Sequence, residues 1–169
     1  MNKVISIGNQ GFDKIRENDY FYVDKTGFIK EWWESGDDVT LITRPRRFGK
    51  TLNMDMLKCF FSNQYTGRAD LFEGLSIWKE EKYRELQGQY PVIFVSFADV
   101  KERDYESAVR KIKHILVDLY LQYEFLKKNF SESEQMRYRQ ISYNMDNVAA
   151  QDALKSLAAL LSSYYGKKA

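Results

Sequence analysis

Cysteine is almost absent from this sequence of 169 residues, since Cys59 is the only one. This excludes an intramolecular disulfide, a cysteine zinc cluster and a redox-active cysteine pair. Long apolar runs are absent too, and no window approaches the roughly 18 residues that are needed to span a bilayer. We therefore expect a cytoplasmic protein that has no membrane association.

An excess of charge of one sign is also missing, because 26 Lys and Arg oppose 24 Asp and Glu to leave a formal net charge of +2. Any function that depends on positive charge must therefore be local. Proline and glycine are scarce, with two and nine residues, and we find neither a linker nor an internal repeat. Since 44% of the residues are apolar, we expect residues 1–169 to form a single domain with a sizeable core.

Apolar residues recur at helical spacing through most of the chain. The pattern predicts helices over the ranges 11–18, 26–35, 50–62, 80–86, 104–127, 131–141 and 151–165. Two short segments, 39–43 and 92–97, are β-branched or almost continuously apolar, which is typical of buried parallel strands. We therefore predict a helix-rich α/β fold, in which helices flank a partial parallel sheet.

Residues 44–51 (RPRRFGKT) lie directly between the first predicted strand and a predicted helix. They end in the Gly-Lys-Thr of a phosphate-binding loop. Gly49 allows the backbone to approach a phosphate, Lys50 neutralises the β- and γ-phosphates, and the Thr51 hydroxyl coordinates Mg²⁺. This context predicts a nucleotide-binding loop of the Walker A kind.

One position departs from the usual Walker A pattern. The pattern begins with glycine, and Arg44 stands at that position. Pro45 restricts Arg44 to an extended conformation, so the turn must begin differently. Arg46 and Arg47 add positive charge that compensates for the missing glycine by attracting phosphate. We therefore interpret residues 44–51 as a variant of the Walker A loop.

Four segments occur in the order known from one protein family: 22–26 (YVDKT), 44–51 (RPRRFGKT), 71–77 (LFEGLSI) and 90–97 (YPVIFVSF). Together they resemble the bacterial AAA-ATPase-like domain family, in which the arginine-rich loop is the normal variant. The resemblance implies an AAA-type P-loop NTPase fold that binds ATP and Mg²⁺. It also implies a nuclease-like domain of the PD-(D/E)XK superfamily as a C-terminal partner in the intact protein.

The resemblance further implies which residues form the site. Those expected to bind the nucleotide are Arg46, Arg47, Phe48, Gly49, Lys50, Thr51 and Leu52. Lys50 is the expected catalytic residue, and Thr51 is the expected magnesium ligand. In the family, the acidic Walker B strand follows a stretch like residues 164–168, where this chain stops. We therefore expect an N-terminal portion of the domain, with weak or absent hydrolysis and an open sheet edge that favours self-association.

Five other residues have a functional and an ordinary structural explanation. Trp32 and Trp33 suit stacking on a nucleotide base, although core packing explains them better. Cys59 has no partner for nucleophilic catalysis and is expected in the core, and His114 is expected on the surface. Asp99 follows an apolar segment, as a replacement for the Walker B acid would, but the resemblance assigns that segment to another position in the sheet.

Two other interpretations of the chain stay open. The basic residues at 44–50, together with the ring of Phe48, suit a module that binds nucleic acid or a protein without any nucleotide. Alternatively, the chain is a folded fragment that binds none of these ligands. In the YVDKT segment, we expect Thr26 to cap the helix that follows, whereas Asp24 and Lys25 have no assigned chemistry.

Overall fold

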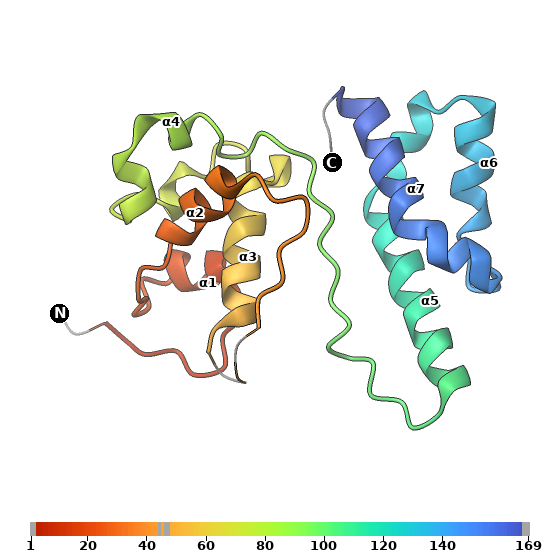
Figure 1. The fold of residues 1–169 in the computed structure, drawn as a ribbon, viewed down its shortest axis with the longest axis horizontal. Coiled ribbons are helices and arrows are strands. Elements are labelled where there is room, and N and C mark those ends of the chain that lie inside the picture. The colour runs from red at the N-terminus through yellow and green to blue at the C-terminus, as the bar shows by residue number, and fades with distance from the viewer. Residues whose placement is uncertain (1–2, 44, 46–47, 167–169) are drawn as a thin grey trace. The chain divides into compact units, whose positions relative to one another are not determined.

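The structure is a computed structural model that describes residues 3–43, 45 and 48–166 (Figure 1). The chain divides into two compact units, Met1–Val92 and Ile93–Ala169. Both units are helical. In the part of the chain that is described, no helix is both long enough and apolar enough to cross a membrane.

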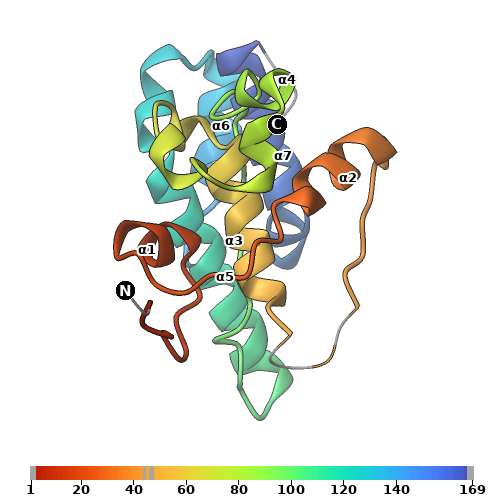
Figure 2. The same ribbon diagram turned by 90° about the vertical axis from the view of Figure 1, so that its left-hand side faces the viewer.

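The first unit is built around the helix that follows the predicted phosphate loop. Its described α-helices are α1 (Phe12–Glu17), α2 (Gly27–Ser35), α3 (Lys50–Phe61) and α4 (Glu81–Arg84). Its described 3-10 helices are η1 (Asn63–Tyr65), η2 (Ala69–Leu71) and η3 (Ser76–Lys79). These bounds confirm the helices predicted at 11–18, 26–35 and 50–62. Helix α1 lies against α3 in both ribbon views (Figures 1 and 2).

The core of the first unit is rich in aromatic rings. Phe12, Phe60 and Phe72 have no exposed surface. The ring centroid of Phe72 lies 5.1 Å from that of Phe12 and 5.0 Å from that of Phe60. Each of these ring pairs stabilises the fold by about 0.5–1.5 kcal/mol beyond the burial of its surface. The three rings come from α1, α3 and the turn after η2, so their contact holds α1 and the connector on α3.

The prediction of a parallel sheet is wrong. Over residues 3–43, 45 and 48–166 the chain forms no β-strand, and its only strand-like pairing is an isolated bridge between Ser62 and Tyr90. Strands are stabilised when their backbone groups pair with a neighbouring strand, and β-propensity alone does not supply that neighbour. Self-association through a sheet edge stays a prediction, but the described residues do not form the edge that motivated it.

The apolar side chains of the two predicted strands have other surroundings. Val39 and Leu41 are 86% and 82% exposed, and the Thr40 hydroxyl between them accepts a hydrogen bond from the Trp32 indole at 3.1 Å. In the second segment, Val92 packs on the core of the first unit, whereas Ile93 and Val95 pack on the core of the second. The prediction that the run at 92–97 is a buried strand is therefore wrong, because Val92, Ile93 and Val95 are only partly buried and Phe97 is 48% exposed.

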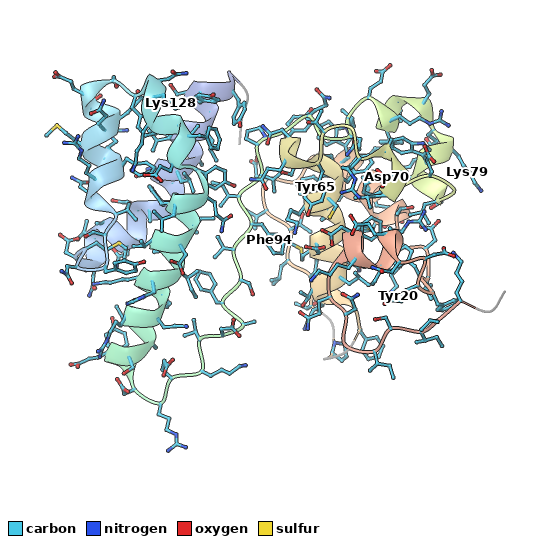
Figure 3. All side chains as sticks on the ribbon, turned by 180° about the vertical axis from the view of Figure 1, so that it is seen from behind. Tyr20, Tyr65, Asp70, Lys79, Phe94 and Lys128 are labelled. Atoms are coloured by element: carbon cyan, nitrogen blue, oxygen red, sulfur yellow. The ribbon has the colours of Figure 1, made fainter. Side chains whose placement is uncertain are left out.

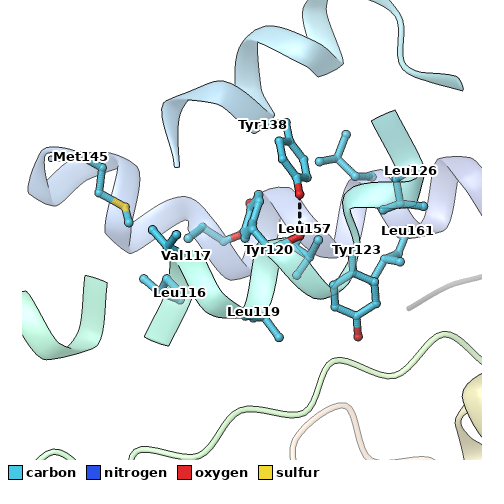
Figure 4. Close-up of a cluster of buried hydrophobic side chains, with 12 residues drawn as sticks. Leu116, Val117, Leu119, Tyr120, Tyr123, Leu126, Tyr138, Met145, Leu157 and Leu161 are labelled. Carbon is cyan, nitrogen blue, oxygen red and sulfur yellow. Dashed lines mark hydrogen bonds between the residues drawn. The ribbon is translucent and has the colours of Figure 1, made fainter. Parts of the chain in front are cut away.

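The second unit is a bundle of helices. Its described elements are α5 (Tyr105–Gln122), η4 (Glu124–Asn129), α6 (Glu132–Gln140) and α7 (Asn147–Tyr165). Helix α7 contacts both α5 and α6 (Figure 1). Leucines from α5 and α7 fill the space between them, including Leu116, Leu119, Leu157 and Leu161 (Figure 4). The long amphipathic helix predicted at 104–127 is confirmed, although its last turns are the 3-10 helix η4.

Two tyrosines connect the three helices of this bundle. The Tyr138 hydroxyl, from α6, donates a hydrogen bond to the carbonyl oxygen of Tyr120 in α5 (Figure 4). The Tyr120 hydroxyl donates in turn to the carbonyl oxygen of Ala153 in α7, at 2.7 Å. Burial raises the pKa of Tyr138 to about 12 and also raises that of Tyr120, so both hydroxyls stay protonated donors at neutral pH.

The helix ends of the second unit follow local capping rules. The Ser131 hydroxyl accepts a hydrogen bond from the amide of Glu134, whose carboxylate accepts one from the Ser131 amide, so the predicted capping box is confirmed. Helix α7 begins four residues earlier than predicted, because Asp146 accepts from the amide of Ala149 at 2.7 Å and caps it. Gly166, with φ 62°, ends α7 as predicted.

Candidate functional site

The predicted phosphate loop leads directly into the N-terminus of α3. Gly49 is the N-cap residue and adopts a left-handed conformation, with φ 74° and ψ 20°, which is strained for any residue with a side chain. The Asn53 amide donates to the Gly49 carbonyl at 2.9 Å, which begins the helical ladder. Phe48 is 58% exposed just before this turn. Arg46 and Arg47, which were also predicted to bind the nucleotide, lie outside the described residues.

A cavity of about 770 Å³ opens at this helix terminus. One wall is formed by Gly49, Lys50, Thr51 and Leu52, and the facing wall by residues 7–10. The structure therefore brings together four of the seven residues predicted to bind the nucleotide. The facing wall was not predicted. Its one sequence signal is the Gly8–Asn9 pair, because Gly8 takes a left-handed conformation, with φ 83°, in the turn there.

Asp55, in the second turn of α3, fixes the facing wall in place. Its side chain is buried, and one carboxylate oxygen accepts a hydrogen bond from the amide of Phe12 at 2.7 Å. The other oxygen forms an ion pair with Lys58, one turn further along α3. Phe12 begins α1, two residues after the wall ends, so this contact sets the position of the wall relative to the start of α3. The sequence signal for this role of Asp55 is the presence of an acidic residue on the apolar face of a predicted helix.

The turn before α2 is held by a second acidic residue. Asp24 accepts hydrogen bonds from the Thr26 amide at 2.9 Å, the Thr26 hydroxyl at 2.6 Å and the Ser76 amide at 2.7 Å. Thr26 occupies the N-cap position, but its side chain makes no capping hydrogen bond, so the predicted capping role is wrong. The Thr26 hydroxyl instead accepts from the amide of Ile77 at 3.2 Å, and Thr26 is completely buried.

These hydrogen bonds set the pKa of Asp24. Burial by itself would raise that pKa, but the hydrogen bonds from Thr26 and Ser76 outweigh burial and hold it below its ordinary value of 3.8. Since the folded-state pKa is lower than the unfolded-state pKa, the resulting stabilisation is complete above the unfolded-state value. It is lost as the pH falls through the folded-state value.

Replacing Asp24 by asparagine is therefore expected to lower the free energy of unfolding at pH 7 by about 1 kcal/mol. The variant should also lose less stability than the wild type when the pH falls from 5 towards 3. Urea unfolding followed by tryptophan fluorescence measures this, because the chain's three tryptophans, Trp32, Trp33 and Trp78, all lie in the first unit. Asp37→Asn, at an exposed position, is the control. Parallel pH profiles for wild type and Asp24→Asn would contradict the prediction.

The other candidates have structural roles. Trp32 and Trp33 pack on Phe61, with ring centroids 5.2 Å and 5.5 Å from its own. The core interpretation is confirmed for Trp32, whereas Trp33 is 38% exposed and contacts the core only from its surface. Cys59 is fully buried, and burial raises its pKa to about 12, which leaves the thiol unreactive. His114 is exposed beside Tyr143, with 4.7 Å between the ring centroids, as expected for a surface histidine.

Asp99 is exposed and belongs to the second unit. Within the described residues, no group of three or more His, Cys, Asp and Glu side chains is arranged to hold a metal ion. Sequence reasoning missed the approach of Lys25 to Gly49. A Cβ atom placed on Gly49 would lie 3.5 Å from the Lys25 ammonium nitrogen.

Comparison with known proteins identifies the class of the chain. A family model described as AAA-ATPase-like, a predicted AAA-ATPase, matches residues 6–169. The chain therefore belongs to the AAA-ATPase-like family, as its four sequence segments predicted. It is 40% identical over 115 residues to a protein of Azotobacter chroococcum mcd 1 named "Uncharacterized protein in vnfD 5'region". That match covers 68% of this chain and 21% of the relative. No solved structure matches the chain.

Proposed function

We propose that this chain binds the magnesium complex of a nucleoside triphosphate, with ATP as the expected one, at the start of α3. The cavity of about 770 Å³ between Gly49–Leu52 and residues 7–10 is the observation that carries the proposal. Cavities of about 300–1,000 Å³ are typical of small-molecule sites. Membership of a family described as a predicted AAA-ATPase favours a nucleotide over other anions.

The wall formed by α3 suits the phosphates. The first amides of any helix have no acceptor within the helix, and the helix dipole places about half a positive charge at that end. Gly49 has no side chain, so a phosphate can approach its backbone closely. Lys50 lines the same cavity, and lysine side chains bind phosphate as point charges. Hydrogen-bond donors and positive charges therefore lie together where the triphosphate would bind.

The facing wall suits the base. Ile7 is 96% exposed although it is apolar, and it lines the cavity. A planar base that packs on Ile7 would remove this surface from water, which is favourable by roughly 25 cal/mol for each Å². Asn9 and Gln10 line the same wall, and their amide groups can donate to and accept from the edge of a base.

The residues around the cavity also fit a magnesium ion that arrives with the nucleotide. The Thr51 hydroxyl supplies one oxygen ligand, and phosphate oxygens and water supply the others, as is usual for Mg²⁺. Among the described residues that line the cavity, none is a carboxylate that would position an attacking water. Phosphoryl transfer depends on such positioning, so we propose tight binding with slow turnover.

Isothermal titration of the full chain with Mg-ATP tests the proposal. Lys50→Ala is expected to weaken binding about 10- to 100-fold, because it removes a charge-assisted hydrogen bond to phosphate. Lys79→Ala is the matched control. Lys79 is an exposed lysine of the same unit that lies far from the start of α3 (Figure 3). Its removal should leave the affinity unchanged, and omission of Mg²⁺ should weaken binding by wild type.

Two results would contradict this function. Equal affinity of wild type and Lys50→Ala for Mg-ATP would place the nucleotide elsewhere. No heat with Mg-ATP, together with strong binding of a short DNA duplex that disappears at high salt, would instead favour the nucleic-acid module suggested by the basic loop.

A further inference from the structure

Lys25 approaches the same glycine that begins α3, although 24 positions separate the two residues in the sequence. The Lys25 ammonium nitrogen lies 3.5 Å from where a Cβ on Gly49 would stand. Lys50, the next residue after Gly49, lines the cavity. Gly49 therefore has one lysine beside it in the sequence and a second beside it in space.

This arrangement suits an anion. Positive side chains are favoured near the C-terminus of a helix and disfavoured near its N-terminus, because the dipole is positive there. Here, two lysines and the N-terminus of α3 bring positive charge to one place. Each of these positive groups would attract an anion that carries several negative charges.

The chain holds Lys25 in this position through the residues on either side of it. Asp24 accepts three hydrogen bonds from Thr26 and Ser76, so its carboxylate ties the turn before α2 to η3. Thr26 is completely buried. Lys25 itself is exposed, and within residues 3–43, 45 and 48–166 its ammonium group forms an ion pair with no carboxylate. The neighbours are fixed, while the lysine between them faces Gly49.

We propose that Lys25 is a second phosphate-binding lysine, which contacts the phosphate chain of the nucleotide together with Lys50. This inference rests on the proposed function, since it names a further ligand of the same site. It assigns chemistry to the YVDKT segment. Asp24 and Thr26 position the turn, and Lys25 binds the anion. Because the contact is to phosphate, its contribution should grow with the number of phosphates and be absent for a nucleoside.

The test compares Lys25→Ala, Lys25→Arg and Lys79→Ala in titrations of the full chain with Mg-ATP, AMP and inorganic tripolyphosphate at constant ionic strength. Lys25→Ala should bind Mg-ATP and tripolyphosphate about 10-fold more weakly, as expected for the loss of one charge-assisted hydrogen bond. Its affinity for AMP should change less than about 2-fold on the same grounds. Lys25→Arg keeps the charge and should retain most of the affinity, and Lys79→Ala should match wild type.

The outcomes separate this inference from the proposed function. If Lys50→Ala weakens Mg-ATP binding and Lys25→Ala does not, the nucleotide site stands and the role of Lys25 is wrong. An equal loss of AMP and ATP affinity in Lys25→Ala would also overturn it, because a general structural defect would then explain the effect. If wild type binds neither Mg-ATP nor tripolyphosphate, both the function and the inference fail. Thermal unfolding of Lys25→Ala should match wild type, since the side chain that it removes is exposed.

Discussion

Replacing Asp55 by alanine is expected to lower the free energy of unfolding of the first unit by about 3 kcal/mol. Asp55 is only 7% exposed, and its carboxylate accepts from the Phe12 amide at 2.7 Å while it pairs with Lys58. Alanine would leave a buried amide without its acceptor and would remove the ion pair with Lys58. Urea unfolding followed by tryptophan fluorescence measures the loss, since the three tryptophans belong to this unit.

Asp55→Asn is the matched control for this prediction. Asparagine keeps a side-chain oxygen that can accept from the Phe12 amide, but it removes the negative charge beside Lys58. Its destabilisation should therefore lie between that of wild type and that of Asp55→Ala. Because Asp55 also fixes the wall at residues 7–10, Asp55→Ala should bind Mg-ATP more weakly at temperatures where it is still folded. Unfolding curves for Asp55→Ala and wild type that coincide would show that the contact with Phe12 stabilises nothing.

Replacing Leu157 by alanine is expected to lower the free energy of unfolding of the second unit by about 3 kcal/mol. Leu157 has no exposed surface and lies on the side of α7 that faces the leucines of α5 (Figure 4). The loss combines two contributions: the transfer free energy of the apolar atoms that are removed and the cost of the cavity that they leave behind. Urea unfolding followed by far-ultraviolet circular dichroism measures it, because α5 and α7 are the longest helices among the described residues.

Leu154→Ala provides the matched control, because it makes the same chemical change in the same helix at a side chain that is 38% exposed. It should lower the free energy of unfolding by less than about 1 kcal/mol, since folding buries less apolar surface at Leu154 than at Leu157. Equal destabilisation by the two substitutions would mean that α7 does not pack through the side that carries Leu157.

The helices and several of their ends could be predicted from local sequence. The periodicity at 50–62 and 104–127 reports which side of a helix is apolar, and this depends only on residues a few positions apart. Ser131 with Glu134, and Gly166 after α7, likewise act within one turn. The resemblance to the AAA-ATPase-like family was also found from contiguous motifs. Gly49, Lys50 and Thr51 share one wall of the cavity because they are neighbours in the chain.

Interactions between distant segments could not be predicted in this way. Residues 39–43 and 92–97 have strand-like composition, yet a strand also needs a partner backbone, and helices and solvent surround these residues instead. The wall at residues 7–10 and the approach of Lys25 to Gly49 both depend on folding of the first unit. Hydrogen bonds from Phe12 to Asp55 and from Ser76 to Asp24 create these contacts across 43 and 52 positions. Local sequence therefore specifies the helices and the phosphate-loop motif. Only tertiary packing gives that motif a facing wall and a second lysine, because both come from segments that are distant in the chain.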